Sequence, residues 1–297
     1  MLSILIPTYN YDVFDLVQSV GNQCIDLGVP FEVLVLDDGS DNVFENPKIN
    51  TLEYCSFQRL DQNIGRSAIR NLLSRKAKYD WLLFLDADTF PKDKLLIKRY
   101  IEEITKDDSP KIIYGGISYQ EEKPEKYKLL RWVYGNKREA LEVNMRNEDK
   151  YLTFLTLNFV IHKQIILSNP FNEKIPNLRN EDLLFSYDLQ KNKAPIVHIN
   201  NKVYHLGIET SEVFMQKTKE LSVSYLFLWN NNLLPYDYTL YGRVFSGIKK
   251  AKLITLVGFG FRLVEKLLLR NLLGSNPSMF VYDIYRLGHI CSIYDRK

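Results

Sequence analysis

Five apolar residues run directly into two carboxylates in the segment Trp81-Leu82-Leu83-Phe84-Leu85-Asp86-Ala87-Asp88. An apolar run of this length is typical of a strand covered on both faces, as in a parallel sheet. Two similar runs, Leu2–Ile6 and Phe31–Leu36, stand earlier, separated by segments with apolar residues at three- and four-residue spacing. This alternation predicts an open, doubly wound, mostly parallel α/β sheet with helices on both faces.

Each of these predicted strands ends in a polar cluster. The first is followed by Pro7-Thr8-Tyr9-Asn10, the second by Asp37-Asp38-Gly39-Ser40 and the third by Asp86-Ala87-Asp88. Ligands of open α/β sheets bind beyond the carboxyl ends of the strands. We therefore expect the three clusters to converge on one edge of the sheet.

Asp86 and Asp88 are candidates for a metal site. Residues i and i+2 of an extended chain point to the same side, so both carboxylates can face one ligand. Two neighbouring anions repel unless a cation separates them, and Mg²⁺ or Mn²⁺ bridging to phosphate oxygens is the usual solution. Two solvated loop carboxylates are the alternative. His205 is a further ligand candidate only if its predicted strand, Lys202–His205, ends near Asp88.

Asp37 and Asp38 admit two interpretations. Asp-Asp-Gly-Ser is good turn chemistry by itself. Alternatively, one carboxylate accepts hydrogen bonds from a nucleotide base or ribose that packs beside Tyr9.

The segment Asn63-Ile64-Gly65-Arg66 leads into a predicted helix. Gly65 permits close backbone approach, and Arg66 and Arg70 share a helical face near the N-terminus. The helix dipole and the guanidinium groups both favour phosphate there, and ordinary surface arginines are the alternative.

A helix is predicted over Glu181–Lys191, with Asn180 as its N-cap. Acidic residues suit a first helical turn, which is sufficient to explain Glu181 and Asp182. The functional interpretation makes one of them a general base toward an acceptor hydroxyl.

The middle of the chain predicts further elements. We expect strands over Lys111–Tyr119 and Phe154–Ile161, a helix over Glu212–Trp229, and a helix pair or lid over Gln120–Lys150.

Charge is unevenly distributed. The 297 residues include 39 Lys/Arg and 36 Asp/Glu, and the net charge of +3 is too small for a dedicated nucleic-acid binder. Residues 241–297 carry +7, which leaves −4 on residues 1–240. An apolar stretch near the end of the chain carries a cation every four residues, at Arg262, Lys266 and Arg270. Its uncharged segments are too short to span a bilayer. This helix either packs on the rest of the chain or lies on an anionic membrane surface.

The three cysteines, Cys24, Cys55 and Cys291, are scattered and form no Cys-x-x-Cys motif. They argue against a disulfide framework or zinc site and favour a reducing cytosol. The first seven residues are typical of a strand rather than a signal peptide.

In their order along the chain, the motifs over about residues 1–230 resemble the family 2 glycosyltransferases of the GT-A fold. The resemblance implies transfer of a sugar from a nucleotide-diphosphate sugar, with UDP favoured, to an acceptor hydroxyl. It further implies inversion at the anomeric carbon, a Mn²⁺ or Mg²⁺ cofactor, and a place in polysaccharide or surface glycan biosynthesis.

The resemblance also implies a role for each matching position. The catalytic base is Asp182, with Glu181 beside it, and Asn158 lies on the acceptor side. The metal ligands are Asp88, Asp86 and His205. The donor-binding residues are Pro7, Thr8, Tyr9, Asn10, Asp37, Asp38, Gly65, Arg66, Arg70, Asp86 and Ala87.

We expect a catalytic domain over residues 1–230, with a donor half over about 1–118 and an acceptor half over about 119–230. A helical basic extension over 231–297 follows. The expected partners are a nucleotide-sugar donor and a glycan or lipid-linked glycan acceptor, and no nucleic acid. The expected location is the cytoplasm, with peripheral contact at the inner membrane face through residues 241–297 as an option.

Two rival functions stay open. A nucleotidyltransferase would need a Gly-rich, Arg-containing phosphate loop after the first strand, which Pro7-Thr8-Tyr9-Asn10 is not. A non-catalytic nucleotide-sugar-binding protein would not need the carboxylates at 86, 88, 181 and 182. The donor base, the sugar, the acceptor and the oligomeric state are left undetermined.

Overall fold

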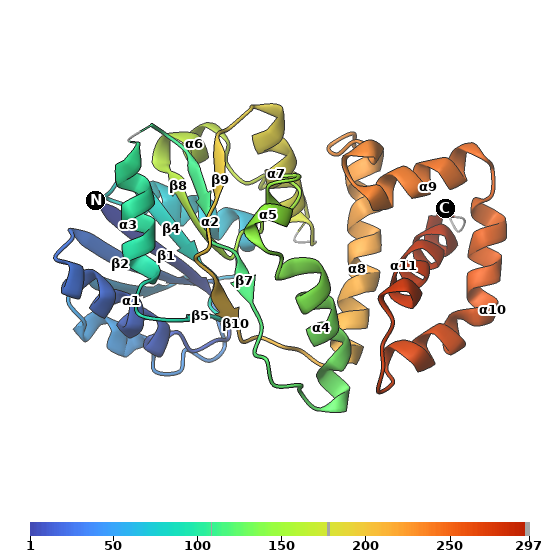
Figure 1. Ribbon diagram of the computed structural model, residues 1–297, viewed down its shortest axis with the longest axis horizontal. Coiled ribbons are helices and arrows are strands. Elements are labelled where there is room, and N and C mark those ends of the chain that lie inside the picture. The colour runs from blue at the N-terminus through green and yellow to red at the C-terminus, as the bar shows by residue number, and fades with distance from the viewer. Residues whose placement is uncertain (108, 177–178, 295–297) are drawn as a thin grey trace. The chain divides into compact units, whose positions relative to one another are not determined.

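The computed structural model describes residues 1–107, 109–176 and 179–294. They form two compact units, whose elements are labelled in Figure 1. The first unit comprises 1–107, 109–120, 140–176 and 181–207, and the second comprises 121–139, 179–180 and 208–294.

A seven-stranded sheet forms the centre of the first unit, in the order β3-β2-β1-β4-β8-β6-β9. Strand β8 is antiparallel to both of its neighbours, and the other adjacent strands are parallel. The strands are β1 (Leu2–Thr8), β2 (Phe31–Asp37), β3 (Cys55–Arg59), β4 (Trp81–Leu85), β6 (Ile112–Tyr114), β8 (Asn158–His162) and β9 (Ile196–His198).

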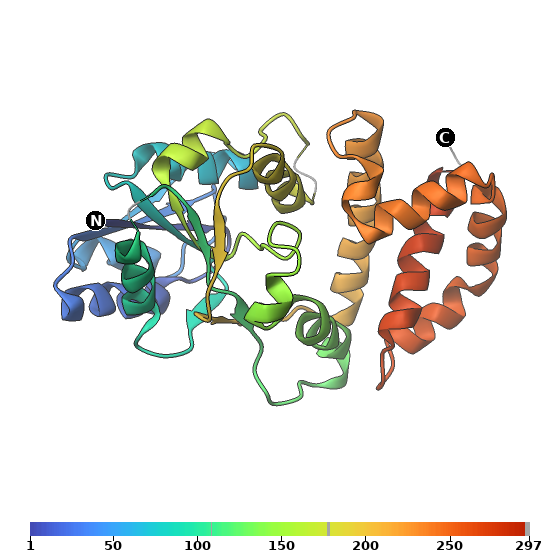
Figure 2. The ribbon, with the colours of Figure 1, turned by 45° about the horizontal axis from the view of Figure 1, so that its top comes forward.

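Helices cover both faces of this sheet (Figures 1 and 2). On one face lie α1 (Phe14–Leu27) and α3 (Leu96–Lys106). On the other, α2 (Arg66–Lys76), α6 (Lys163–Ser168) and α7 (Glu181–Lys191) bury apolar side chains against β1, β4 and β8. The predicted doubly wound, mostly parallel architecture is therefore confirmed.

A small second sheet places the end of β10 beside the end of β4. It consists of β5 (Thr89–Pro91), β10 (Val203–His205) and β7 (Ile117–Ser118), in the order β5-β10-β7. In the antiparallel register of β10 and β5, His205 lies opposite Thr89. His205 is thus next to the residue that follows Asp88.

Two of the predicted strands need correction, and one strand was not predicted. The run Lys111–Tyr119 is not one strand, because the chain turns at Gly116 (φ +89°) and β6 and β7 belong to different sheets. The strand predicted from Phe154 begins only at Asn158. Strand β3 was not predicted, because its residues are mostly exposed and carry no apolar run.

The second unit is helical. Its core joins Phe214, Phe261, Tyr282 and Tyr285. The helices are α4 (Leu129–Tyr134), continued by a π-helical turn (Gly135–Glu139), then α8 (Ser211–Asn230), α9 (Leu240–Lys250), α10 (Ile254–Leu272) and α11 (Met279–Tyr294).

The helix predicted over Glu212–Trp229 is α8, and it belongs to the second unit rather than to a unit that ends at residue 230. The predicted extension covers residues 231–297, and its last three residues, 295–297, lie outside the part of the chain that the structure describes. Over the residues that the structure describes, no helix has the length and apolar character needed to cross a bilayer.

Candidate active site

The three polar clusters meet at one edge of the large sheet. Strands β2, β1 and β4 are adjacent and parallel, so Asp37, Thr8 and Leu85 end on the same side. The expected convergence is confirmed.

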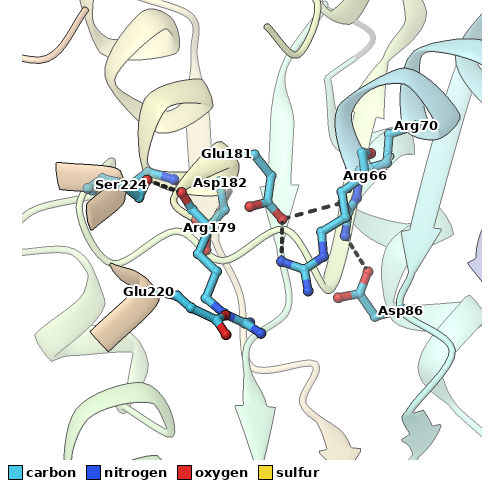
Figure 3. Close-up of polar contacts among 9 residues, drawn as sticks. Arg66, Arg70, Asp86, Arg179, Glu181, Asp182, Glu220 and Ser224 are labelled. Atoms are coloured by element: carbon cyan, nitrogen blue, oxygen red, sulfur yellow. Dashed lines mark hydrogen bonds and ion pairs between the residues drawn. The ribbon is translucent and has the colours of Figure 1, made fainter. Parts of the chain in front are cut away.

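Arg70 ties two of the predicted site segments together (Figure 3). Its side chain is only 6% exposed. The Nη2 atom lies 2.7 Å from Asp86 Oδ1, and the Nη1 atom lies 3.9 Å from Glu181 Oε1. Arg70 therefore holds the end of β4 and the start of α7 against α2, and its guanidinium is already occupied by carboxylates rather than free for a diphosphate.

Arg66 lies one turn earlier on α2 and is much more accessible. Its side chain is 47% exposed, and its Nη1 atom lies 3.6 Å from Glu181 Oε1. Helix α2 begins after Gly65 (φ +88°), a cap residue that has no side chain to occupy the first amides. The exposed cation at this helix N-terminus is thus Arg66.

Glu181 and Asp182 have different surroundings although they are adjacent. Glu181 is buried and lies near both arginines. Asp182 accepts a hydrogen bond from the backbone N–H of Leu183 at 2.8 Å and forms no ion pair with any residue that the structure describes. Burial and the neighbouring Glu181 carboxylate raise the pKa of Asp182 to about 6. An unpaired carboxylate with a raised pKa is suited to accept a proton.

The N-cap predicted at Asn180 has a different geometry. Asn180 adopts a left-handed conformation (φ +75°) rather than the extended one usual for an N-cap. Its amide donates to the Leu221 carbonyl at 3.5 Å, within the second unit. Asn180 is therefore a sharp bend immediately before α7.

Asp88 and His205 form the candidate metal site. The His205 Nε2 atom lies 3.4 Å from Asp88 Oδ2. The condition set for His205 is thereby met. No group of three or more His, Cys, Asp or Glu side chains that could enclose a metal occurs in the described chain. An oxygen and an imidazole donor fit a divalent cation such as Mn²⁺ whose other ligands come from phosphate and water.

Asp86 and Asp88 do not face a single ligand, contrary to expectation. The chain turns after β4, where the Thr89 N–H donates to the Asp86 carbonyl at 3.0 Å. Asp86 then points to Arg70, whereas Asp88 points to His205. Residues i and i+2 point to the same side only where the chain is extended, and here the chain turns.

Asp37 and Asp38 are buried and stabilise loops. Asp37 Oδ1 accepts from the Ser40 N–H at 2.7 Å. The N–H groups of Ile64 and Gly65 donate to Asp38 at 2.7 and 3.1 Å, which orients the loop before α2. Burial raises the pKa of Asp38, while these two amides oppose the rise. The turn interpretation of this motif accounts for the observed contacts.

The first cluster offers an exposed aromatic ring. Tyr9 is 51% exposed, Pro7 is half-buried, and Thr8 is buried with its hydroxyl donating to the Tyr11 carbonyl at 3.0 Å. Asn10, at φ +50°, accepts from the Asp41 N–H at 3.1 Å through its side chain. Of this cluster, Tyr9 is the side chain most available to a ligand. Ala87, in the turn between Asp86 and Asp88, is half-buried.

Asn158 is fully buried and belongs to the fold. The Tyr100 hydroxyl donates to Asn158 Oδ1 at 2.8 Å, and Asn158 Nδ2 donates to the carbonyls of Gly116 and Asn201 at 2.8 and 2.9 Å. These contacts use its polar atoms and leave no surface for an acceptor. The expected acceptor-side role of Asn158 is not supported by its position.

Sequence reasoning missed residues around Asp88. A Cβ at Gly207 would collide with Asp88 Oδ2. The Tyr119 ring packs beside His205, with ring centroids 5.4 Å apart. Burial, and then the Asp88 charge, raise the pKa of Tyr11. Position next to a motif is the one signal that could have indicated Tyr11 and Gly207.

Residues 3–171 match the sequence model of Glycosyl transferase family 2. The chain belongs to this family. A hyaluronan synthase from Pasteurella multocida is 34% identical to this chain over 119 residues, or 38% of this chain and 12% of that protein. A chondroitin synthase from Escherichia coli is 33% identical over 118 residues, or 38% of this chain and 17% of that protein. The matched region thus spans less than a fifth of these relatives.

Solved structures share the fold. The Staphylococcus aureus TarS 1–349 structure superposes with a TM-score of 0.53 at 19% identity, covering 99% of this chain and 91% of that one. TarS 1–349 in complex with UDP gives a TM-score of 0.53 at 20% identity, with the same coverage. Together with the family match, this likeness confirms the predicted GT-A fold.

Proposed function

We propose that this chain is a metal-dependent, inverting glycosyltransferase that moves a sugar from a UDP-sugar to an acceptor hydroxyl in polysaccharide or surface glycan synthesis. One observation carries the proposal. Arg70 contacts both Asp86 and Glu181, and so joins the turn that bears Asp88 to the helix that bears Asp182. A metal-binding carboxylate and a proton-accepting carboxylate are thereby held at the same edge of one sheet.

Donor activation depends on positive charge. A nucleoside diphosphate gains negative charge as it leaves, and a divalent cation held by Asp88 and His205 would supply charge neutralisation there. Arg66, the exposed guanidinium at the start of α2, is placed to bind a phosphate oxygen. Arg70 has a positioning role instead, because its charge is used by Asp86 and Glu181.

Transfer requires a single base. Asp182 accepts the proton of the acceptor hydroxyl while that oxygen forms a bond to the anomeric carbon. The bond from this carbon to the diphosphate oxygen breaks on the opposite face, and both electrons leave with the diphosphate. A single displacement of this kind inverts the configuration and needs no second catalytic carboxylate.

The donor class is supported by two observations. Tyr9 presents an exposed ring beside the end of β1, where a base can stack. TarS, which has the same fold, was crystallised with UDP and with UDP-GlcNAc. The names of the curated relatives, hyaluronan and chondroitin synthases, favour a polysaccharide acceptor.

The test is UDP release from a panel of UDP-sugars with Mn²⁺, with Mg²⁺ and with EDTA. Asp88→Ala should lower metal-supported turnover at least ~100-fold, because a metal ligand is lost. Asp15→Ala, which removes an exposed carboxylate from α1, is the matched control and should be silent. Unchanged turnover in folded Asp88→Ala would contradict the metal assignment. Donor binding by the wild-type chain without any turnover across donors and acceptors would favour a non-catalytic nucleotide-sugar-binding protein.

A further inference from the structure

We propose that one face of helix α10 binds the surface of an anionic lipid bilayer. This face, the α10 stripe, combines large exposed apolar side chains with unpaired cations. Its apolar members are Leu256 (66% exposed), Phe259 (54%), Leu263 (70%) and Leu267 (66%), and its cations are Arg262, Lys266 and Arg270.

The apolar members lie on one side of the helix. Their spacing of three and four residues brings them onto a single face. The opposite side is the packed one, where Phe261 contacts Tyr285 of α11 with ring centroids 5.2 Å apart. A Cβ at Gly288 of α11 would collide with the Phe261 ring, so the two helices are in close contact there. The core of the second unit therefore does not account for the α10 stripe.

The cations are free to meet an anionic partner. Arg262, Lys266 and Arg270 are exposed, and none of them forms an ion pair with another described residue. The helix has one acidic residue, Glu265, which accepts from the Tyr285 hydroxyl at 3.0 Å and lies 3.6 Å from Lys219 Nζ. The stripe thus carries a net positive charge along one border of its apolar row.

A lipid surface fits these features better than a second copy of the chain. Two copies packed through the stripe would bring six uncompensated cations into one apolar interface, which electrostatics opposes. A bilayer with anionic headgroups supplies an apolar phase for the leucines and negative charge for the cations, which long side chains reach from the interface. The charges at 262, 266 and 270 favour a helix that lies along the surface.

Vesicle flotation of the full chain tests the proposal. We use liposomes of phosphatidylcholine with 30% phosphatidylglycerol, against phosphatidylcholine alone, without donor. Binding should be at least ~10-fold tighter to the anionic vesicles, since each cation near such a surface adds about 1 kcal/mol. Leu263→Ser/Leu267→Ser and Arg262→Gln/Lys266→Gln/Arg270→Gln should each weaken it at least ~10-fold while circular dichroism and turnover of soluble substrates stay as in the wild type.

Matched controls use the same changes in the first unit. Leu95→Ser/Leu167→Ser and Lys94→Gln/Lys98→Gln/Lys106→Gln alter exposed residues and should leave flotation unchanged. Asp88→Ala should also float as the wild type does, which separates this proposal from the transferase activity. Equal binding to both vesicle types would overturn the proposal, as would indifference to the stripe variants. A dimer that Leu263→Ser/Leu267→Ser abolishes, with no flotation, would assign the stripe to self-association instead.

Discussion

At the scale of single residues, Glu181 and Asp182 show how position divides the work of two neighbouring carboxylates. Glu181 faces Arg66 and Arg70 and is buried, so its charge anchors the start of α7. Asp182 accepts from the backbone N–H of Leu183 and forms no ion pair with a described residue at the same helix end. This difference in environment, which adjacency in sequence does not reveal, is the reason for proposing Asp182 rather than Glu181 as the base.

Replacing Asp182 separates chemistry from binding. Asp182→Asn should reduce transfer by about 10²–10⁴-fold, because the proton acceptor is lost, while the Kd of the donor changes less than about threefold. The measurement is turnover together with donor binding by calorimetry. Glu181→Gln is the matched control and should disturb the arginine contacts with a smaller loss of turnover. A loss of transfer in Glu181→Gln as large as that expected for Asp182→Asn would assign the base to Glu181 instead of Asp182.

The pH dependence of turnover tests the same assignment of Asp182. Turnover should rise with pH through about 6 and then level off, because the raised pKa keeps Asp182 protonated below that value. The charged groups that act on it are Glu181, which raises the pKa, and Arg66 and Arg70, which lower it. A flat profile between pH 5 and 7.5 would exclude Asp182 as the base.

The ionised Asp182 carboxylate should also lower the stability of the folded chain at neutral pH. Because its folded-state pKa is above the unfolded value, its stabilising contribution is full below about pH 4 and is lost as the pH rises through about 6. Asp182→Asn should therefore have a higher Tm than the wild type at pH 7.5 and little difference at pH 4. Thermal denaturation at the two pH values measures this, and a lower Tm at pH 7.5 would contradict it.

Gly207 is required by the Asp88 carboxylate. Gly207→Ala should push the end of the Asp88 side chain away and lower metal-supported turnover at least ~10-fold. The Tm should fall by no more than about 2 °C, since the displaced atoms belong to a flexible side chain. Gly247→Ala on α9, where a Cβ would meet nothing within 4 Å, is the control. Wild-type activation by Mn²⁺ in Gly207→Ala would show that the contact is not needed.

The site residues differ in how well the sequence could predict them. His205 could be predicted conditionally, because its short strand was visible and only its pairing with β5 was missing. Asn158 could not, because its burial depends on Tyr100, Gly116 and Asn201, which are distant in sequence. The position of Arg70 beside Asp86 could be expected from its place at the start of a helix, but its contacts with both Asp86 and Glu181 depend on tertiary packing.

At the scale of secondary-structure elements, the break between β6 and β7 is stabilised by one buried arginine. Arg146, at the end of α5 (Val143–Arg146), is fully buried and donates to the carbonyls of Tyr114, Gly115 and Ile199 at 3.3, 3.4 and 2.9 Å. Its guanidinium occupies the space beside Gly116, where a Cβ would come within 2.9 Å. Backbone N–H groups of Ile199 and Asn201 also donate to these carbonyls, so the Arg146 guanidinium adds a second, charged donor that ties the turn to the chain around Ile199.

Removing that guanidinium should weaken the first unit. Arg146→Met should lower the free energy of unfolding by about 3 kcal/mol or more, since three hydrogen bonds from a buried charged group are lost at roughly 1.5–3 kcal/mol each. Arg146→Lys retains one cationic donor and should lose less. Urea denaturation followed by fluorescence gives both values, and a loss below about 1 kcal/mol in Arg146→Met would contradict the assignment.

Elements with a complete local signal were predictable from sequence. Helix α7 has its predicted bounds, and β1, β2 and β4 were visible as apolar runs. The split at Gly116 was not, because a Gly-Gly pair in an apolar run also suits a continuous strand, and the side chain that fills the turn comes from residue 146.

At the scale of the whole molecule, each of the two units has buried apolar side chains of its own among the residues that the structure describes. One set lies around β4, β8 and α7, and the other joins α8, α10 and α11. The residues of the proposed donor site, Tyr9, Arg66, Asp88 and His205, all belong to the first unit. Ligand binding should therefore act on one core only.

Calorimetry should resolve two unfolding transitions. A UDP-sugar with Mn²⁺ should raise the transition of the first unit by several degrees at about 100 times Kd, because ligand binds the folded form alone. The other transition should stay in place, and Asp88→Ala should remove the shift. One transition that moves as a whole would show that the two cores unfold together.

The division of the chain into units has a consequence for inheritance. Residues 121–139 and 179–180 join the second unit from within the sequence of the first. Within that unit, Leu130 takes its place in the core beside Phe214, and the Arg179 guanidinium lies 2.8 Å from Glu220. The segment from residue 208 onward therefore cannot be exchanged by itself without losing contacts that residues 121–139 and 179–180 make within the second unit. Recombination that introduced a new C-terminal region would have to supply contacts for these two upstream segments. Substitutions in the segments and in the C-terminal region are therefore expected to be correlated during evolution.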